Sequence, residues 1–303
     1  MAKLNETQQR ILALKKEKNA LVLAHYYVPL EAQDVADHVC DSFEMAKCAR
    51  DAKEDLIVIC GVRFMGESAK ILSPGKTVLL PALDAGCPMA DMVTPEVVEQ
   101  MRKAHPGAAV MCYVNSSAAV KAVSDVCCTS SSALRIAREM PEEEIIFVPD
   151  QHLGSYVAAQ VPEKKFYVHD GFCPTHHRVT AEDVMRAQDA HPNAVFAVHP
   201  ECRKDVVDFA DFVGSTAEIL KFASQTDAEE IIIGTESTIV ERLRRDFPEK
   251  KIYSVSSSFT CSNMKKVTAA DLLAALEKEQ FKVELSQQEL TGARRSLDRM
   301  VSM

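Results

Sequence analysis

Short, uninterrupted runs of apolar residues recur along the chain, and segments with the apolar spacing of a helix lie between them. In the first third these runs are NALVLAHYY (19–27), DLIVICG (55–61) and KTVLLPAL (76–83). Continuous apolar strands are expected where helices cover both faces of a parallel sheet. Strands that alternate with helices in this way predict an α/β protein.

This order of apolar runs and helical segments occurs three times along the chain. EEEIIFVPD (142–150) matches EEIIIGTES (229–237), and RVTAEDVMRAQ (178–188) matches KVTAADLLAAL (266–276). Four pairs of chemically distinct residues all differ by 174 in residue number: His25 and His199, Ser42 and Thr216, Cys87 and Cys261, and Thr94 and Thr268. The equivalent residues of the middle copy are Tyr113, Ser130, Cys173 and Thr180. Generic α/β similarity does not hold such a register, so we interpret the chain as a triplicated unit of about 87 residues.

Each unit is expected to run strand, helix, strand, helix, strand. We predict three αβα lobes with parallel sheets, related by pseudo-threefold symmetry and arranged as a triangle around a central site. The expected lobes are residues 1–93, 94–179 and 180–267, followed by a C-terminal helical closure at 268–303. Thr94 (with Pro95 behind it), Thr180 and Thr268 are expected to cap helices.

Composition narrows the possible functions. The 303 residues carry a formal net charge of −9, which argues against nucleic acid or an anionic membrane as the main partner. No apolar run approaches the roughly 20 residues of a membrane span, and the first residues are typical of an amphipathic helix rather than a signal peptide. We therefore expect a cytoplasmic protein. Of its ten cysteines, Cys48, Cys60 and Cys112 lie in apolar segments and are expected in the core.

Polar residues follow the first strand of each unit in pairs spaced by two. The pairs are His25 and Tyr27, Tyr113 and Asn115, and His199 and Glu201. This spacing on an extended segment places both side chains on one side, and ligands bind beyond the carboxyl ends of parallel strands.

The helix that follows is expected to begin at Ser42, Ser130 or Thr216. Such hydroxyls are first of all N-caps, but three helix N-termini together also favour anions. A small polyanion is the expected ligand.

Cys87, Cys173 and Cys261 occupy equivalent loops after the third expected strand of each unit. On a threefold axis their thiolates would meet, and soft thiolates suit zinc or an iron–sulfur cluster. A 4Fe-4S cube held by three cysteines leaves one iron open as a Lewis acid, whereas structural zinc sites are usually local in sequence. His176 and His177 have no counterparts in the other lobes, so we expect surface or supporting positions for them.

Several motifs carry a family resemblance. AHYYVPLEAQDVADHVCDS, GCPMAD, CYVNSSAAVKA, CTSSSA, PDQHLG, GFCPTHH, AVHPEC, VGSTAEIL and GTESTIVERL occur in this order. Each is weak alone, but together the chain resembles the quinolinate synthase family of bacterial NAD biosynthesis along essentially its whole length. The resemblance implies a triangular three-lobed enzyme. It also implies a 4Fe-4S cluster on Cys87, Cys173 and Cys261.

The same resemblance implies a reaction and a set of roles. The family condenses iminoaspartate with dihydroxyacetone phosphate to quinolinate, phosphate and water. Its substrate-binding positions fall on His25, Ser42, Tyr113, Asn115, Ser130, His199, Glu201 and Thr216. As catalytic residues we predict Tyr27, Tyr113, His199 and Glu201, with Glu201 as a base and Tyr27 and His199 as a proton-shuttling pair. An aspartate oxidase or aspartate dehydrogenase is a possible functional partner that supplies the imine.

Three alternatives stay open at this stage. A cluster-dependent hydro-lyase acting on another small polyacid would share the three cysteines and the open iron. A three-lobed binding or sensor protein would hold zinc on the same residues. An enzyme with a cysteine nucleophile would explain one thiol and leave two equivalent ones without a role.

Overall fold

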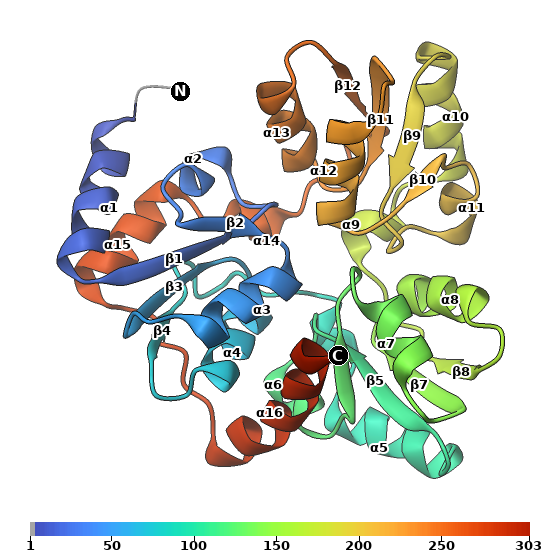
Figure 1. The fold of residues 1–303 in the computed structure, drawn as a ribbon, viewed down its shortest axis with the longest axis horizontal. Coiled ribbons are helices and arrows are strands. Elements are labelled where there is room, and N and C mark those ends of the chain that lie inside the picture. Colours follow the sequence, from blue (N-terminus) through green and yellow to red (C-terminus); the bar gives the residue numbers. More distant parts are fainter. Residues whose placement is uncertain (1–3) are drawn as a thin grey trace.

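The computed structural model describes residues 4–303 and contains three four-stranded sheets, each of them all parallel. In Figure 1 the three sheets and their helices form separate lobes around a common centre, in blue, green and gold along the chain. The predicted fold class, three αβα lobes arranged as a triangle, is confirmed. The division at residues 93, 179 and 267 remains a prediction, and the sheets draw on residues 20–79, 109–168 and 195–254.

The first lobe has the strand order β2-β1-β3-β4. Its strands are β1 (Ala20–His25), β2 (His38–Cys40), β3 (Leu56–Cys60) and β4 (Thr77–Leu79). Its helices are α1 (Glu6–Glu17), α2 (Leu30–Gln33), α3 (Ser42–Asp51) and α4 (Arg63–Leu72). Every residue of β1 and β3 is buried, as the uninterrupted apolar runs predict.

The second and third lobes repeat this order as β6-β5-β7-β8 and β10-β9-β11-β12. The second contains β5 (Ala109–Tyr113), β6 (Val126–Cys128), β7 (Glu144–Val148), β8 (Lys165–Val168), α5 (Pro95–Ala104), α6 (Ala118–Ala122), α7 (Ala133–Glu139) and α8 (Gln151–Gln160). The third contains β9 (Val195–Val198), β10 (Phe212–Val213), β11 (Glu230–Gly234), β12 (Lys251–Ser254), α10 (Ala181–Ala190), α11 (Lys204–Val207), α12 (Thr216–Gln225) and α13 (Thr238–Asp246).

The expected three strands per unit were one too few. Each lobe has an additional short strand, β2, β6 or β10, at one edge of its sheet, preceded by a short helix. These strands have only two or three residues, too few to produce a recognisable apolar run. The edge strands are held by an aspartate at the same place in each lobe. Asp37, Asp125 and Asp211 each accept the backbone N–H of a residue 15 positions earlier in the central strand, at 2.8 Å.

The third lobe shows the three layers most directly. Phe196 and Val198 of β9 pack on one face of the sheet in one apolar cluster, together with Val184 of α10. Ala197, between them in sequence, packs on the other face with Ile219 of α12. The first two lobes instead share a single continuous core.

The remaining helices connect and close the lobes. They are the 3₁₀ helix η1 (Ala90–Met92), α9 (Pro174–His177), α14 (Ser262–Lys265), α15 (Ala269–Lys278) and α16 (Gln287–Ser302). The predicted C-terminal closing helix is confirmed as α16, which lies against the first two lobes in Figure 1, while α15 lies beside α1. The expected caps Thr94, Thr180 and Thr268 are also confirmed.

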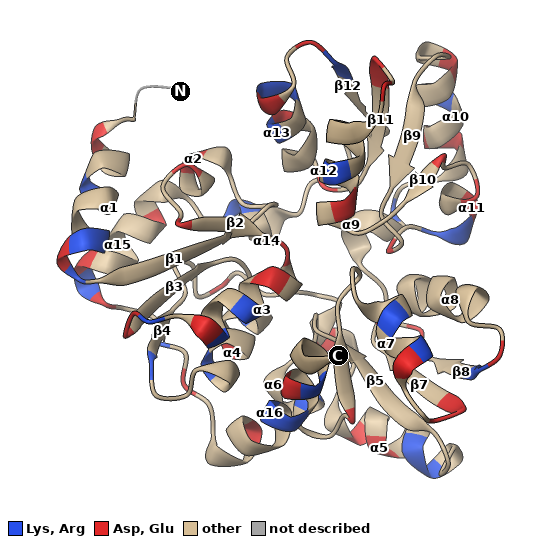
Figure 2. Ribbon diagram, viewed as in Figure 1, with Lys and Arg blue, Asp and Glu red and all other residues tan. Residues whose placement is uncertain are grey.

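Charged residues of both signs are interspersed on the helices of all three lobes (Figure 2). Within the described residues, no helix has the length and hydropathy needed to cross a bilayer. Cys60 and Cys112 are fully buried, as predicted, but Cys48 is only partly buried on α3, so its expected core position is wrong. All ten cysteines are free thiols.

Candidate active site

One cavity of about 120 Å³ is lined by residues from all three lobes. All twelve residues singled out from the sequence line it: His25, Tyr27, Ser42, Cys87, Tyr113, Asn115, Ser130, Cys173, His199, Glu201, Thr216 and Cys261. They come together because the carboxyl ends of β1, β5 and β9 face the same centre. This single site therefore requires all three lobes.

The two histidines that follow β1 and β9 have the same local structure. The backbone N–H of Tyr27 donates to Nδ1 of His25 at 3.2 Å, and that of Glu201 donates to Nδ1 of His199 at 3.2 Å. The chain turns here rather than staying extended, so the expected geometry of the pairs was wrong although their location was right. Because Nδ1 accepts, a neutral ring carries its proton on Nε2.

Both rings are neutral near pH 7. Burial lowers the pKa of His25 to about 3 and the pKa of His199 to about 4, although the charge of Glu201 opposes both shifts. Nε2 of His199 lies 3.2 Å from the hydroxyl of Ser130 in the second lobe, to which it donates. The site therefore offers N–H donors for oxygen atoms of a ligand without adding positive charge.

Two of the three helices begin where predicted, at Ser42 and Thr216, but α7 begins at Ala133 rather than at Ser130. Asp41 and Ser215 are the N-caps of α3 and α12, so Ser42 and Thr216 are the first residues inside those helices. Ser130 lies in the turn before α7, ahead of its N-cap Ser132. The expectation that these three side chains cap the helices is therefore wrong. All three side chains nevertheless line the cavity, where Oγ1 of Thr216 lies 2.7 Å from the Tyr27 hydroxyl and Oγ of Ser130 lies 3.2 Å from Nε2 of His199.

Glu201 is buried and joins the second and third lobes. Its Oε1 accepts the hydroxyl of Tyr113 at 2.6 Å, and its Oε2 lies 2.9 Å from Nδ1 of His176. Burial alone would raise the pKa of Glu201. The charge of His176 and its hydrogen bond to the carboxylate, together with the charge of His199 and the hydrogen bond from the Tyr113 hydroxyl, lower this pKa below the ordinary range. Glu201 is thus ionised in this arrangement. Burial also raises the pKa of the Tyr113 phenol, which stays protonated.

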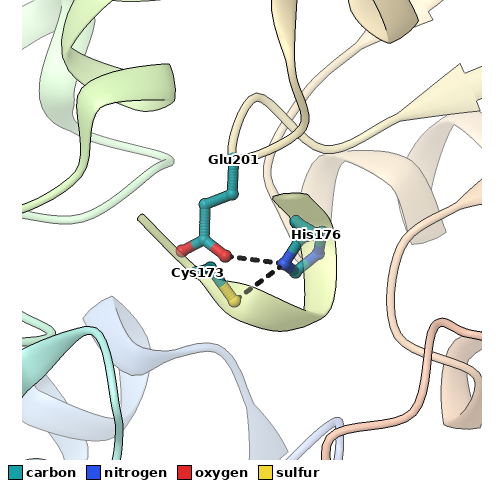
Figure 3. Close-up of side chains that lie close together, drawn as sticks. All are labelled: Cys173, His176 and Glu201. Carbon is teal, nitrogen blue, oxygen red and sulfur yellow. Dashed lines mark hydrogen bonds and ion pairs between the residues drawn. The ribbon is translucent and has the colours of Figure 1, made fainter. Parts of the chain in front are cut away.

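His176 belongs to this site: of the surface and supporting positions expected for it, the structure has the supporting one. His176 is 1% exposed, and its Nδ1 also lies 3.2 Å from Sγ of Cys173. Figure 3 shows the imidazole beside both the thiol and the Glu201 carboxylate. Ligand atoms of these three residues lie within 4.8 Å of one another, a spacing that a metal ion could bridge. His177 is partly buried and stacks on Phe172 instead.

Tyr27 reaches out of the first lobe into the third. Its hydroxyl lies 2.7 Å from Oγ1 of Thr216 and 2.8 Å from Oγ1 of Thr235. Burial raises the pKa of this phenol well above its ordinary value. Among the described residues, its hydroxyl partners are these threonines and not His199, so the two members of the predicted proton-shuttling pair are not hydrogen-bonded to each other.

The three cysteines have equivalent surroundings. Burial raises the pKa of each thiol, to about 12 for Cys87 and well above its ordinary value for Cys173, and it also raises the pKa of Cys261. In each case the backbone N–H three residues further on, in η1, α9 or α14, opposes the shift. The protein alone therefore keeps the thiols protonated. A metal that binds them must displace the protons.

Two polar features mark where a ligand would lie. Oδ1 of Asn115 is buried at the cavity wall without a hydrogen-bond partner among residues 4–303. Arg178 is the one lysine or arginine among the residues that line the cavity, and it is exposed. A buried polar atom without a partner costs stability unless a bound molecule satisfies it.

Sequence reasoning missed the part that Thr235 and Glu236 play. Both are fully buried, and Glu236 lines the cavity beneath the Cys261 loop. The motif GTEST (234–238) was visible and sits at the end of a predicted strand. Polar residues directly after a buried strand indicate that they belong to a site, but the prediction used only the residues after the first strand of each unit.

These features define a class: a three-lobed α/β enzyme whose single site is shared between lobes and includes cysteine, histidine and carboxylate side chains able to hold a metal. Comparison with known proteins is more specific. The quinolinate synthetase A protein family matches over residues 9–302. A quinolinate synthase of Caldicellulosiruptor bescii is 50% identical over 296 residues, which cover 98% of each chain. The chain belongs to the quinolinate synthase family.

Two further relatives show the same full-length match. A quinolinate synthase of Alkaliphilus metalliredigens is 47% identical over 302 residues, covering 99% of this chain and 100% of its own. A protein of Methanosarcina acetivorans named quinolinate synthase 2 is 47% identical over 295 residues, covering 97% and 95%. The resemblance stated from the motifs is thereby confirmed.

Proposed function

We propose that this enzyme condenses iminoaspartate with dihydroxyacetone phosphate to give quinolinate, phosphate and water, as a step of NAD biosynthesis. The observation that carries the proposal is the single cavity lined by three cysteines and by polar residues from three lobes. Both substrates are small and anionic. Hydroxyls and neutral N–H donors that line one cavity suit their carboxylate, carbonyl and phosphate oxygens.

The donor set fits a 4Fe-4S cluster on Cys87, Cys173 and Cys261. Three thiolates on one zinc ion at about 2.3 Å would hold their sulfurs about 3.8 Å apart. Within residues 4–303, the three sulfurs do not form a group with all members within 4.8 Å of one another, although all three line the cavity. The thiols are near enough to act on one another's pKa, since Cys261 raises the pKa of Cys87 and Cys87 raises that of Cys173, which supports one shared centre. When bound, a cluster with three cysteine ligands supplies an open iron as a Lewis acid.

The protein's own residues divide into binding and proton-moving groups. We assign the holding of substrate oxygens to three kinds of group: the N–H groups of His25 and His199, the amide of Asn115, and the hydroxyls of Ser42, Ser130 and Thr216. Loss of phosphate, bond formation, ring closure and dehydration all move protons. General acids and bases typically contribute about 10²–10⁴-fold to such steps.

Tyr113 and Glu201 form the best-defined proton-moving pair. Their 2.6 Å hydrogen bond joins a protonated phenol to an ionised carboxylate, so the phenol can donate and the carboxylate can accept. The lowered pKa of Glu201 makes it a weak base while His176 holds it. Its predicted role as a base therefore requires that a substrate replaces part of these contacts. Tyr27 is proposed as a second acid or base.

The test is an anaerobic assay of the purified protein with both substrates, followed by the ultraviolet absorbance of the pyridine product. Wild-type protein should contain iron and acid-labile sulfide and should form quinolinate. Cys173→Ala should fold but lack both the cluster and the activity, whereas Cys48→Ala, which changes a thiol away from the cavity, should keep both. A colourless Cys173→Ala protein with normal turnover would contradict the proposal.

The same experiment separates the alternatives. Iron and sulfide without quinolinate would favour a hydro-lyase acting on another polyacid, and zinc without iron would favour a binding or sensor protein. An aspartate oxidase or dehydrogenase is the proposed source of the imine. The ten free thiols support a reducing, cytoplasmic compartment.

A further inference from the structure

Cys173, His176 and Glu201 bring three unlike ligand atoms together at the wall of the cavity. Nδ1 of His176 lies 2.9 Å from Oε2 of Glu201 and 3.2 Å from Sγ of Cys173, and the ligand atoms of all three residues lie within 4.8 Å of one another. Figure 3 shows the imidazole in contact with both the sulfur and the carboxylate. Among residues 4–303, no other group of three or more cysteine, histidine or acidic side chains is as close.

The spacing and the chemistry of these atoms suit one zinc ion. Thiolate, imidazole and carboxylate ligands lie about 2.0–2.3 Å from zinc, so neighbouring ligand atoms of a tetrahedral site are about 3.4–3.6 Å apart. The two distances from Nδ1 are only a few tenths of an ångström shorter, at 2.9 and 3.2 Å. Sulfur and nitrogen ligands favour zinc over the hard ions magnesium and calcium. Three protein ligands leave a fourth position open for water.

Each of the three side chains is also held by a contact away from the place of the ion. Oε1 of Glu201 accepts the Tyr113 hydroxyl at 2.6 Å, which leaves Oε2 for the metal. Nε2 of His176 lies 3.0 Å from Oγ1 of Thr235, so it can carry the ring proton while Nδ1 binds. The backbone N–H of His176 donates to the sulfur of Cys173. Outer contacts of this kind orient metal ligands and typically contribute about 10- to 100-fold to affinity.

We propose that cluster-free protein binds one zinc ion on Cys173, His176 and Glu201, and that this ion blocks insertion of the cluster. The two metal centres exclude each other because both need the sulfur of Cys173. Zinc takes the place of the thiol proton, which is released. The exclusion rests on the proposed function, which assigns Cys173 to the cluster. The zinc site itself rests only on the geometry of its three ligands.

The first test is an anaerobic titration of the cluster-free protein with Co²⁺, a coloured substitute for zinc. Each thiolate–cobalt bond adds to a near-ultraviolet charge-transfer band, so its intensity counts the bound thiolates. We expect one Co²⁺ per chain with the intensity of a single thiolate, and zinc should displace it. Cys173→Ala should abolish the band, whereas Cys87→Ala and Cys261→Ala should keep it. His176→Asn and Glu201→Gln should each weaken binding by roughly 100-fold or more, because each removes a ligand.

The second test measures competition with the cluster and needs no turnover. Protein is reconstituted with iron and sulfide after one equivalent of zinc has been added, and its iron content is compared with that of a zinc-free sample. Zinc should lower the iron content of the wild type and of Cys48→Ala, which changes a thiol away from the cavity. His176→Asn keeps all three cluster cysteines but lacks a zinc ligand, so its iron content should be the same with and without zinc.

Several results would overturn the inference. A band with the intensity of three thiolates, or its loss in Cys87→Ala or Cys261→Ala, would place the ion on the cysteines instead. Unchanged Co²⁺ affinity in His176→Asn and Glu201→Gln would exclude their side chains as ligands. Normal iron uptake by zinc-loaded wild type would refute the exclusion.

Two checks keep the outcomes separate. Far-ultraviolet circular dichroism shows whether each variant is folded, and His176→Gln carries the same expectations if His176→Asn does not fold. A wild-type protein that holds its cluster but makes no quinolinate would refute the proposed function. The Co²⁺ spectra would still decide whether the zinc site exists.

Discussion

Lys265 uses all three N–H groups of its side chain in contacts with other residues, and replacing it with methionine should destabilise the protein strongly. Its Nζ donates to Oε1 of Glu236 at 2.7 Å, to the backbone carbonyl of Tyr27 at 3.0 Å and to the hydroxyl of Thr238. An ammonium group has three N–H donors, so all of them are used. The side chain thus ties α14 to the third lobe and to the end of β1.

The size of the effect follows from what the substitution leaves behind. Glu236 is fully buried, and without Lys265 its carboxylate keeps only neutral donors, chiefly the backbone N–H groups of Cys261 at 3.2 Å and Thr238 at 2.9 Å. Removing one partner of a buried ion pair costs about 3–5 kcal/mol. The Lys265 side chain is 27% exposed, which places the expected loss near the lower end, at about 3 kcal/mol.

The neighbouring lysine is a matched control. Nζ of Lys266 lies 2.8 Å from the Asp84 carboxylate, but the two side chains are 39% and 77% exposed. An exposed pair of this kind contributes about 0–1 kcal/mol, so Lys266→Met should be almost neutral. The two variants remove the same charge from adjacent positions and differ in burial and in the partners they lose.

The assay is urea denaturation of the reduced, metal-free protein. The chain has no tryptophan, so far-ultraviolet circular dichroism is the appropriate signal. Combining Lys265→Met with Glu236→Gln removes the unpaired charge and should recover part of the lost free energy of unfolding. Equal losses for the two lysine variants, or a double variant as unstable as the sum of its single changes, would refute the reasoning.

Three further outcomes are expected. Gly292→Ala should destabilise the protein by about 1–3 kcal/mol, although alanine is the better helix former, because its Cβ would lie 2.7 Å from that of Ala122; a higher thermal midpoint would contradict this. His25 binds a proton in the unfolded chain near pH 6.5 but in the folded protein only near pH 3, so the free energy of unfolding should fall as the pH decreases below 6.5. Between pH 7.5 and 5.0 the wild type should lose about 2 kcal/mol more than His25→Asn, and equal losses would contradict the burial argument. Glu236→Ala should lower the iron content after anaerobic reconstitution, because the carboxylate accepts the backbone N–H of Cys261; full iron content would exclude that role.

The sequence predicted the architecture because the repeat preserves its register. Apolar runs of four to six residues define the main strands. The constant spacing of His25, Cys87 and their counterparts indicated that equivalent residues of the three units lie around one centre. The edge strands escaped prediction because two or three residues carry no periodicity. Their anchor, an aspartate such as Asp37 bonded to the central strand, is a contact between segments that only the folded chain reveals.

The candidate site shows a similar division. Its twelve predicted residues line one cavity, because strand ends and repeat positions are visible in sequence. Part of their local geometry was missed. The turn after His25 and the caps at Asp41 and Ser215 rest on contacts two or three residues along the chain, whereas the burial of His176 depends on neighbours in space. The repeat left the position of His176 undecided. Because it has no counterpart in the other lobes, a surface or a supporting position was expected, and its contacts with Glu201 and Cys173 are supporting ones that use the asymmetry of the three lobes.

That asymmetry has a consequence for how variants of this site behave. Glu201 contacts Tyr113 and His176, and His176 contacts Thr235, so a change at any one of them alters the hydrogen-bond options of the others. Effects of residues in one network are not additive. The losses measured for single substitutions here should therefore sum to more than the loss of the combined variant. Because the members of the network come from different lobes, the non-additive part of these losses also reports how rigidly the lobes are positioned relative to one another.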